Sequence, residues 1–111
     1  MFELVYCSMA SPGLSKEDVS EILETSISNN AKNNITGCLL LFNNEFAQIL
    51  EGEESVVKAL FNTIKKDQRH NHFLLLGSGS KDKRLFPSWS MAYQNLNESV
   101  DAYSSSEFVK N

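Results

Sequence analysis

The residue whose chemistry most needs an explanation is Gln48, in the segment 45-EFAQILEGE-53. Phe46, Gln48 and Leu50 occupy alternate positions, and this period of two is the pattern of a β-strand. Gln48 therefore shares a strand face with two large apolar side chains. A buried primary amide left unpaired costs about 1–3 kcal/mol. We therefore expect groups on the same face that form hydrogen bonds with Gln48.

Three other polar side chains are predicted to face the same layer. Tyr6 follows Phe2 and Leu4 on one face of a strand over residues 2–10, and Ser26 and Asn30 extend the apolar stripe of a helix. Together these groups suit a planar ligand rich in heteroatoms, because amides pair with carbonyl and N–H edges. Taken singly, each has an ordinary explanation. A strand tyrosine is usually a core residue, and an asparagine near a helix end is often a C-cap.

The elements that must position these residues alternate between strands and helices. Ser15 is predicted to cap the first helix, with Asp18 completing a capping box. The expected elements are a strand at 2–10, a helix at 16–32, a hairpin at 35–52, a helix at about 54–66, a short apolar strand and Gly/Ser loop within 69–80, a connector at 81–87, and a strand at 88–94. This βαββαββ order predicts an α+β ferredoxin-like sandwich, a five-stranded mixed sheet with two helices on one face.

The composition narrows the class of protein. The chain has 111 residues and a net charge of −4, with 14 acidic and 10 basic residues. The length predicts one domain. The net negative charge argues against nucleic acid or an anionic membrane as the main partner. No apolar run is long enough to span a bilayer and no signal peptide is visible. Cys7 and Cys38 lack metal spacing, so we expect free thiols and a cytoplasmic protein.

Several other motifs are better explained by structure than by chemistry. His70 and His72 have the spacing of a metal or nuclease motif, but no cysteine or acidic residue is spaced nearby to serve as a third ligand. The run 77-GSGS-80 lacks the lysine and helix of a phosphate loop. The acidic cluster 51-EGEE-54 could mimic a catalytic carboxylate pair, yet at a helix start we expect its side chains to be solvated.

The sequence resembles the BLUF domains, which are blue-light receptors that bind FAD. The resemblance covers nearly the whole core, and its specificity comes from the order and spacing of several short segments. These segments are 4-LVYCSMA-10, 25-TSISNNAKNNITG-37, 46-FAQILEG-52, 67-DQRH-70 and 86-FPSWSM-91.

The resemblance implies a role for each matching residue. Tyr6 corresponds to the tyrosine that gives an electron and a proton to the excited flavin. Gln48 corresponds to the glutamine that bridges this tyrosine to the flavin and rearranges after excitation. Asn30 corresponds to the asparagine that holds the carbonyl edge of the ring, and Asn29 to a neighbouring position that is Asn or His in relatives.

Further positions are implied around the same crevice. The residues that match flavin contacts are Ser26, Lys32, Asp67, Arg69 and His70. Trp89 and Met91 match a pair of residues that exchange places near the glutamine. One position departs from the family, since Thr63 stands where several members carry a basic residue.

The resemblance also implies an organisation and partners. Residues 1–96 would form the FAD-binding domain, and residues 97–111 a linker or the start of a capping helix. The domain would be a sensor without enzymatic turnover, a homodimer, and a regulator of an effector domain or partner protein. Two alternatives stay open: an interaction module without flavin, and a small ferredoxin-like enzyme. An acylphosphatase-like enzyme would need an arginine in the loop at 9–15, which has none.

Overall fold

The computed structural model describes residues 1–88 and 90–95. Trp89 and the predicted linker at 97–111 therefore lie outside the described residues. The elements of the described part are β1 Phe2–Ala10, α1 Lys16–Lys32, β2 Thr36–Phe42, β3 Glu45–Gly52, α2 Glu54–Ile64, β4 His70–Ser80 and β5 Ala92–Asn95.

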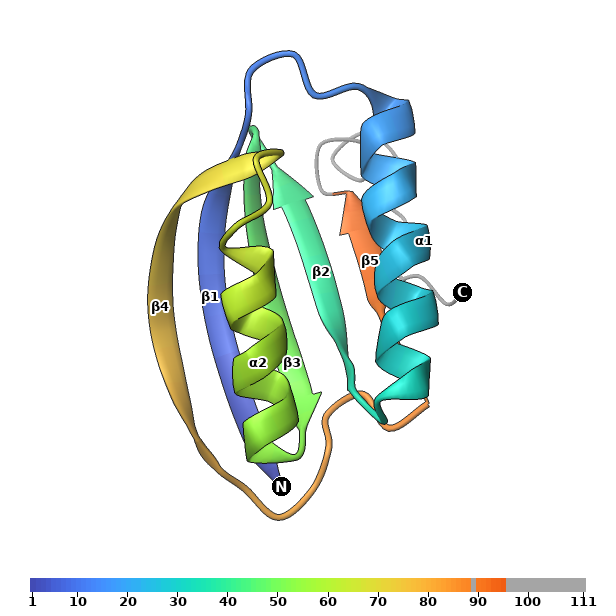
Figure 1. Cartoon of the computed structure of the whole chain (residues 1–111), viewed down its shortest axis with the longest axis vertical. Coiled ribbons are helices and arrows are strands. Elements are labelled where there is room, and N and C mark those ends of the chain that lie inside the picture. The colour runs from blue at the N-terminus through green and yellow to red at the C-terminus, as the bar shows by residue number, and fades with distance from the viewer. Residues whose placement is uncertain (89, 96–111) are drawn as a thin grey trace.

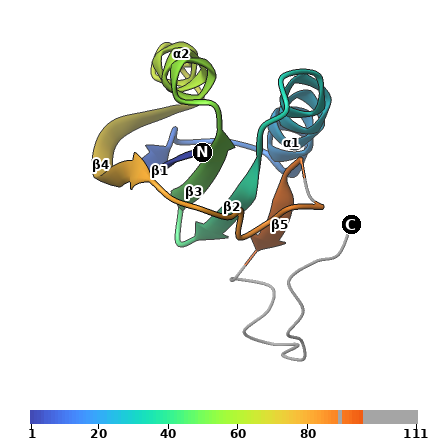
Figure 2. The same ribbon diagram turned by 90° about the horizontal axis from the view of Figure 1, so that it is seen from below.

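The five strands form one mixed sheet in the order β4-β1-β3-β2-β5. β5 runs parallel to β2, and the other neighbours pair antiparallel. Both helices lie on the same face of the sheet, side by side across its width (Figures 1 and 2). This arrangement confirms the predicted α+β ferredoxin-like fold. In the described part of the chain, neither helix is long and apolar enough to cross a membrane.

Alternation along the central strands builds the core beneath the helices. On β1, Phe2, Leu4 and Tyr6 are buried, and on β3 Phe46 and Leu50 are buried. The two helices cover this face with their apolar sides. Ile27 of α1 is an apolar residue that this face leaves partly outside, since 39% of its surface stays exposed. At about 100° per residue, this position lies at the edge of the face whose centre carries Ile22, Ser26 and Asn30.

Local signals fix the start of α1 and the β2–β3 turn. Ser15 and Asp18 form the predicted capping box, with each side chain bonded to the other residue's backbone N–H at 3.0 Å. Asn43 and Asn44 connect the hairpin strands with φ values of 50° and 66°. Asparagine tolerates this left-handed region better than most residues, which suits a two-residue hairpin turn.

Two predicted boundaries were wrong. β4 continues through the Gly/Ser run to Ser80, because β1 pairs with it from Phe2 opposite Ser80 to Ala10 opposite His70. Backbone pairing along a long neighbour overrides the low strand propensity of glycine. β5 begins at Ala92 instead of residue 88. Its ladder with β2 begins where Ala92 lies opposite Cys38.

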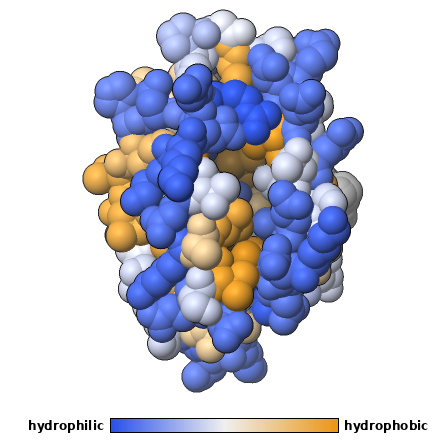
Figure 3. All heavy atoms as spheres, in the orientation of Figure 1, coloured by the Kyte–Doolittle hydropathy of each residue, from blue (hydrophilic) through white to orange (hydrophobic). Residues whose placement is uncertain are grey.

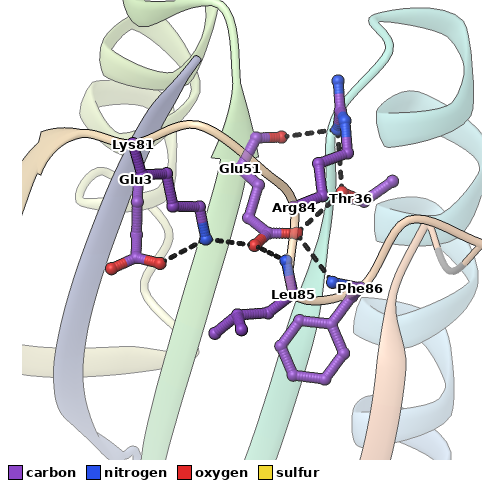
Figure 4. A network of polar contacts seen from close by, with 7 residues as sticks. All are labelled: Glu3, Thr36, Glu51, Lys81, Arg84, Leu85 and Phe86. Atoms are coloured by element: carbon purple, nitrogen blue, oxygen red, sulfur yellow. Dashed lines mark hydrogen bonds and ion pairs between the residues drawn. The ribbon is translucent and has the colours of Figure 1, made fainter.

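The expectation that the acidic cluster at 51–54 is solvated was also wrong for one residue. Glu51 is fully buried, with 0% of its surface exposed, whereas Glu53 and Glu54 are exposed. The β4–β5 connector covers Glu51 and supplies hydrogen-bond donors to its carboxylate (Figure 4). These donors come from residues more than thirty positions away, so local sequence does not reveal them.

Candidate functional site

A pocket opens between the two helices, with the sheet as its floor. Its volume of about 130 Å³ is roughly ten times what one water molecule requires. Figure 3 shows the surface hollowed between the helices, with hydrophobic atoms inside the hollow. Tyr6, Asn30 and Gln48, the three residues of the predicted site that come from three different elements, all line it. The fold therefore brings the predicted groups together.

Tyr6 and Gln48 form the buried centre of the pocket. They lie directly opposite each other where β1 pairs with β3, so their side chains rise from the same face of the sheet. The Tyr6 hydroxyl donates a hydrogen bond to Gln48 Oε1. Tyr6 is 1% exposed and Gln48 is 5% exposed. Burial, with a contribution from the charge of Asp67, raises the pKa of Tyr6 far above its usual value, so the phenol keeps its proton.

The amide nitrogen of Gln48 has only a weak acceptor among the described residues. Gln48 Nε2 lies 3.5 Å from the Sδ atom of Met91, which is itself 4% exposed. A thioether sulfur accepts hydrogen bonds poorly. A buried donor with so poor a partner indicates that a better acceptor belongs in the pocket. The structure places Met91, one member of the predicted exchanging pair, beside Gln48.

The side chain of Asn30 forms a tertiary hydrogen bond and does not cap the helix. Its side chain is 2% exposed, and its Nδ2 donates to the carbonyl oxygen of Ser90 at 3.1 Å. The C-cap of α1 is Asn33. Asn30 therefore links the C-terminal half of α1 to the segment that enters β5, next to the pocket.

Asp67, Arg69 and His70 form the polar end of the pocket, after α2. Arg69 Nη2 contacts the Asp67 carboxylate at 2.7 Å, and this pairing holds the pKa of Asp67 below its usual value. His70 is buried, and its Nδ1 lies 2.9 Å from Ser8 Oγ. Burial is the main cause that lowers the pKa of His70; Asp67 opposes the shift and Arg69 adds to it. The imidazole is therefore neutral at pH 7.

The remaining predicted contacts divide into two groups. Ser26 and Asn29 line the pocket, and so does Thr63, the position that departs from the family pattern. Lys32 is exposed in the last turn of α1 and is not among the residues that line the pocket. The structure therefore does not bring Lys32 to the pocket, and its contact with the flavin cofactor stays a prediction.

Sequence reasoning missed the apolar wall and one polar partner. The unpredicted apolar lining is contributed by Ile22, Leu39, Phe46, Leu60 and Ile64. Helical and strand periodicity marked these residues as core, which is the same signal that a pocket wall gives. Ser8 follows Tyr6 at the next inward position of β1, so its alternation could have identified it as a partner for a buried group.

The lining fits one class of ligand well. An apolar wall can pack against the faces of a planar ring, and the amides, hydroxyls and charged pair can bond to heteroatoms on its edge. The Gln48 side chain accepts a hydrogen bond from Tyr6, while its Nε2 atom has only the weak acceptor Met91 Sδ. These features suit a flavin, whose ring is planar and carries carbonyl and nitrogen acceptors on one edge. The residues present therefore fit this cofactor.

Comparison with known proteins assigns the family. A family model described as sensors of blue-light using FAD matches residues 1–92. The chain belongs to the BLUF family. BLUF domains are sensor modules, so this chain is a sensor domain and not an enzyme domain, in agreement with the sequence analysis.

Relatives of this BLUF domain include larger proteins. The photoactivated adenylate cyclase subunit beta of Euglena gracilis is 36% identical over 79% of this chain and 10% of its own length. The chain therefore spans about a tenth of the curated relatives it matches. A bacterial light-regulated adenylyl cyclase structure is 44% identical, with a TM-score of 0.86 over 88% of this chain and 29% of the other.

A shorter BLUF protein matches over most of both chains. The dark-state structure of BlrB is 31% identical, with a TM-score of 0.85, and the match covers 90% of this chain and 76% of that chain. This BLUF fold therefore occurs both in large cyclases and in proteins not much longer than the domain.

Proposed function

We propose that this BLUF domain is a blue-light photoreceptor that binds FAD non-covalently between α1 and α2, and that Tyr6 and Gln48 are its switch. The observation that carries the proposal is the buried Tyr6–Gln48 hydrogen bond beside the pocket, with a thioether as the weak acceptor for Gln48 Nε2. The bound flavin supplies the absorption of blue light and an electron acceptor.

The two switch residues have complementary chemistry. The phenol of Tyr6 is protonated and buried, so it can release an electron and a proton together without a permanent charge in the pocket. The amide of Gln48 has one acceptor atom and two N–H donors, so it can satisfy two different hydrogen-bond patterns. A wrong pattern in a dry site costs about 1–3 kcal/mol, which is enough to bias a two-state element.

The other pocket residues hold the cofactor. We propose that Asn30, Ser26 and Asn29 bind the ring edge from α1, and that Asp67, Arg69 and His70 bind from the opposite side. Since the charges of Asp67 and Arg69 neutralise each other, this end of the pocket can bind the uncharged polar edge of a flavin ring. Trp89 and Met91 are proposed to respond to the Gln48 rearrangement.

The finer identity of the cofactor and the output are part of the same proposal. We propose FAD as the natural flavin in preference to FMN. Residues 1–96 would be the binding domain, and residues 97–111 a linker or the start of a capping helix that leads to a downstream effector or partner. The free thiols of Cys7 and Cys38 support a cytoplasmic location.

The surface of β4 supports the proposed protein contacts, including a homodimer. Leu74, Leu75 and Leu76 are each at least 50% exposed, and Figure 3 shows hydrophobic atoms gathered on the β4 side. Three consecutive exposed leucines on an edge strand are unusual for a free surface.

The decisive experiment records absorption in darkness and under blue light. The wild-type protein is expected to be yellow, to shift its flavin bands to the red in light, and to recover in darkness. Gln48→Leu should keep the fold and the flavin but abolish the shift, because leucine cannot change hydrogen bonds. Denaturing the protein and separating the released cofactor by chromatography distinguishes FAD from FMN.

Gln68→Leu is the matched control, since Gln68 is exposed and the substitution makes the same chemical change outside the buried site. It should retain the full shift. A normal red shift in Gln48→Leu would overturn the switch proposal. A protein that stays colourless after incubation with FAD would favour an interaction module without flavin.

A further inference from the structure

Glu51 is a buried carboxylate that the photochemical site does not use directly. It lies on β3 three positions after Gln48, and its side chain points to the sheet face opposite the helices (Figure 4). None of its surface is exposed. A buried carboxylate is costly unless several donors surround it, so its partners identify its role.

The donors to Glu51 come mainly from the connector between β4 and β5. Oε2 accepts the backbone N–H of Leu85 at 2.5 Å, and Oε1 accepts that of Phe86 at 3.0 Å. Lys81 adds an ion pair to Oε2. The Thr36 hydroxyl donates to Oε1 at 3.0 Å from the neighbouring strand. One carboxylate therefore ties three residues of the connector to the centre of the sheet.

Arg84 fastens the same connector at a second place. Its Nη1 donates to Thr36 Oγ1 at 2.8 Å and to the backbone carbonyl of Glu51 at 3.1 Å. Its Nη2 donates to the Asn34 carbonyl at 2.9 Å. These bonds lie at the start of β2 and the end of β3, so the connector spans both strands (Figure 4).

The fastened connector leads to two residues that contact the pocket lining. Ser90, whose carbonyl accepts from Asn30, and Met91, whose sulfur meets Gln48 Nε2, follow Phe86 by four and five residues. Five residues reach at most roughly 17 Å when fully extended, and Pro87 further restricts the path. The position of Met91 therefore depends on where residues 85 and 86 are held.

We propose that Glu51 is a positioning residue for the Gln48 switch, which holds the β4–β5 connector so that Ser90 and Met91 meet Asn30 and Gln48. This inference rests on the proposed photoreceptor function. Gln48 and Glu51 lie on one strand and face opposite sides of it. β3 therefore links Gln48 on one face of the sheet to the β4–β5 connector on the other face.

The test compares Glu51→Gln with wild type in the flavin-loaded full chain. The substituted amide would lose the charge that Lys81 pairs with and would turn an N–H group toward backbone donors. We expect flavin binding and the red shift to remain, but dark recovery to slow by about two- to tenfold, the factor that one net hydrogen bond contributes. Amide exchange at Leu85 and Phe86 should accelerate in darkness, independently of any photochemistry.

Two controls separate positioning from other effects. Glu54→Gln makes the same chemical change at an exposed residue that pairs with Lys58, and its recovery rate should match wild type. Val57→Ala removes a buried contact in α2 away from the connector. It should lower stability without changing recovery, so a general loss of stability would not reproduce the Glu51→Gln result.

Arg84→Met decides the question if Glu51→Gln does not fold, since it breaks the second fastening and leaves the buried carboxylate paired. It should slow recovery in the same direction. Wild-type recovery in whichever of these two variants folds would overturn the positioning role while leaving the photoreceptor proposal intact. Absence of a red shift in the wild-type protein itself would instead overturn both proposals.

Discussion

At the scale of single residues, the site depends on a pair that the sheet register places face to face. Tyr6 and Gln48 are direct neighbours across β1 and β3, and each satisfies part of the other's hydrogen-bonding capacity. The amide nitrogen is the part left poorly satisfied. Because Gln48 Nε2 has only a weak acceptor, a ligand acceptor that enters the pocket can change the hydrogen bonds of the pair.

Replacing Tyr6 by phenylalanine tests the role of the phenol. Tyr6→Phe keeps the ring contacts with Phe61 and Phe73 but leaves Gln48 Oε1 without its donor. The unfolding free energy should fall by about 1–3 kcal/mol, the cost of an unsatisfied buried acceptor. Flavin should still bind, and the light-induced red shift should disappear in the absorption spectrum.

Tyr93→Phe serves as the comparison, because Tyr93 packs against the core without lining the pocket. Its red shift should be preserved. If Tyr6→Phe also retained a normal shift, the electron and proton would have to come from another group.

At the scale of elements, α1 carries one side of the pocket and β3 carries both Gln48 and Glu51. α1 supplies Ser26, Asn29 and Asn30, and its first turn is fixed by the Ser15 and Asp18 capping box. The helix therefore starts at a defined residue, and this fixes the direction in which each later side chain points around the helix axis. A change at its N-terminus should affect stability more than photochemistry.

Ser15→Ala removes the cap and tests this separation. The variant should lose about 1 kcal/mol of stability, equivalent to about 4–8 °C in Tm for a domain of this size. Thermal unfolding followed by circular dichroism measures the change, and the red shift should persist. Ser28→Ala, at an exposed interior position of α1, should show no such loss, and an equal loss in both variants would contradict the capping role.

At the scale of the whole molecule, hydrogen-bonded carboxylates couple stability to pH. Burial alone would raise the pKa of Glu51, but the hydrogen bonds from Lys81, the Leu85 and Phe86 N–H groups and Thr36 lower it below its usual value. Arg69 lowers the pKa of Asp67, and Ser15 lowers that of Asp18. These groups bind protons more tightly in the unfolded chain, so folding is favoured where they are ionised.

The expected pH dependence of stability follows from these lowered carboxylate pKa values. The stabilisation should be fully present above about pH 4.5, the usual value for a glutamate, and should be lost as pH falls through the lower folded pKa. Urea denaturation between pH 7 and pH 3 measures it. Glu51→Gln should weaken the acid dependence without abolishing it, because Asp67 and Asp18 remain. An unchanged acid slope in Glu51→Gln would contradict the contribution of Glu51.

The sequence by itself determined the features whose signals are local. The capping box at Ser15 and Asp18 and the inward alternation of Tyr6 and Gln48 follow from neighbouring residues, and both agree with the structure. The family resemblance also rested on short segments, two of which contain Tyr6 and Gln48. These signals operate over a few residues, because they reflect backbone geometry and the two-residue or 3.6-residue repeat.

Only the tertiary structure decided which distant segments meet. The length of β4 depends on pairing with β1, and the start of β5 depends on pairing with β2, where Ala92 lies opposite Cys38. Burial of Glu51 and the approach of Met91 to Gln48 arise from contacts more than thirty residues apart. The residues next to a side chain in the sequence do not indicate which distant residue will cover it. These features could therefore be seen only in the tertiary structure.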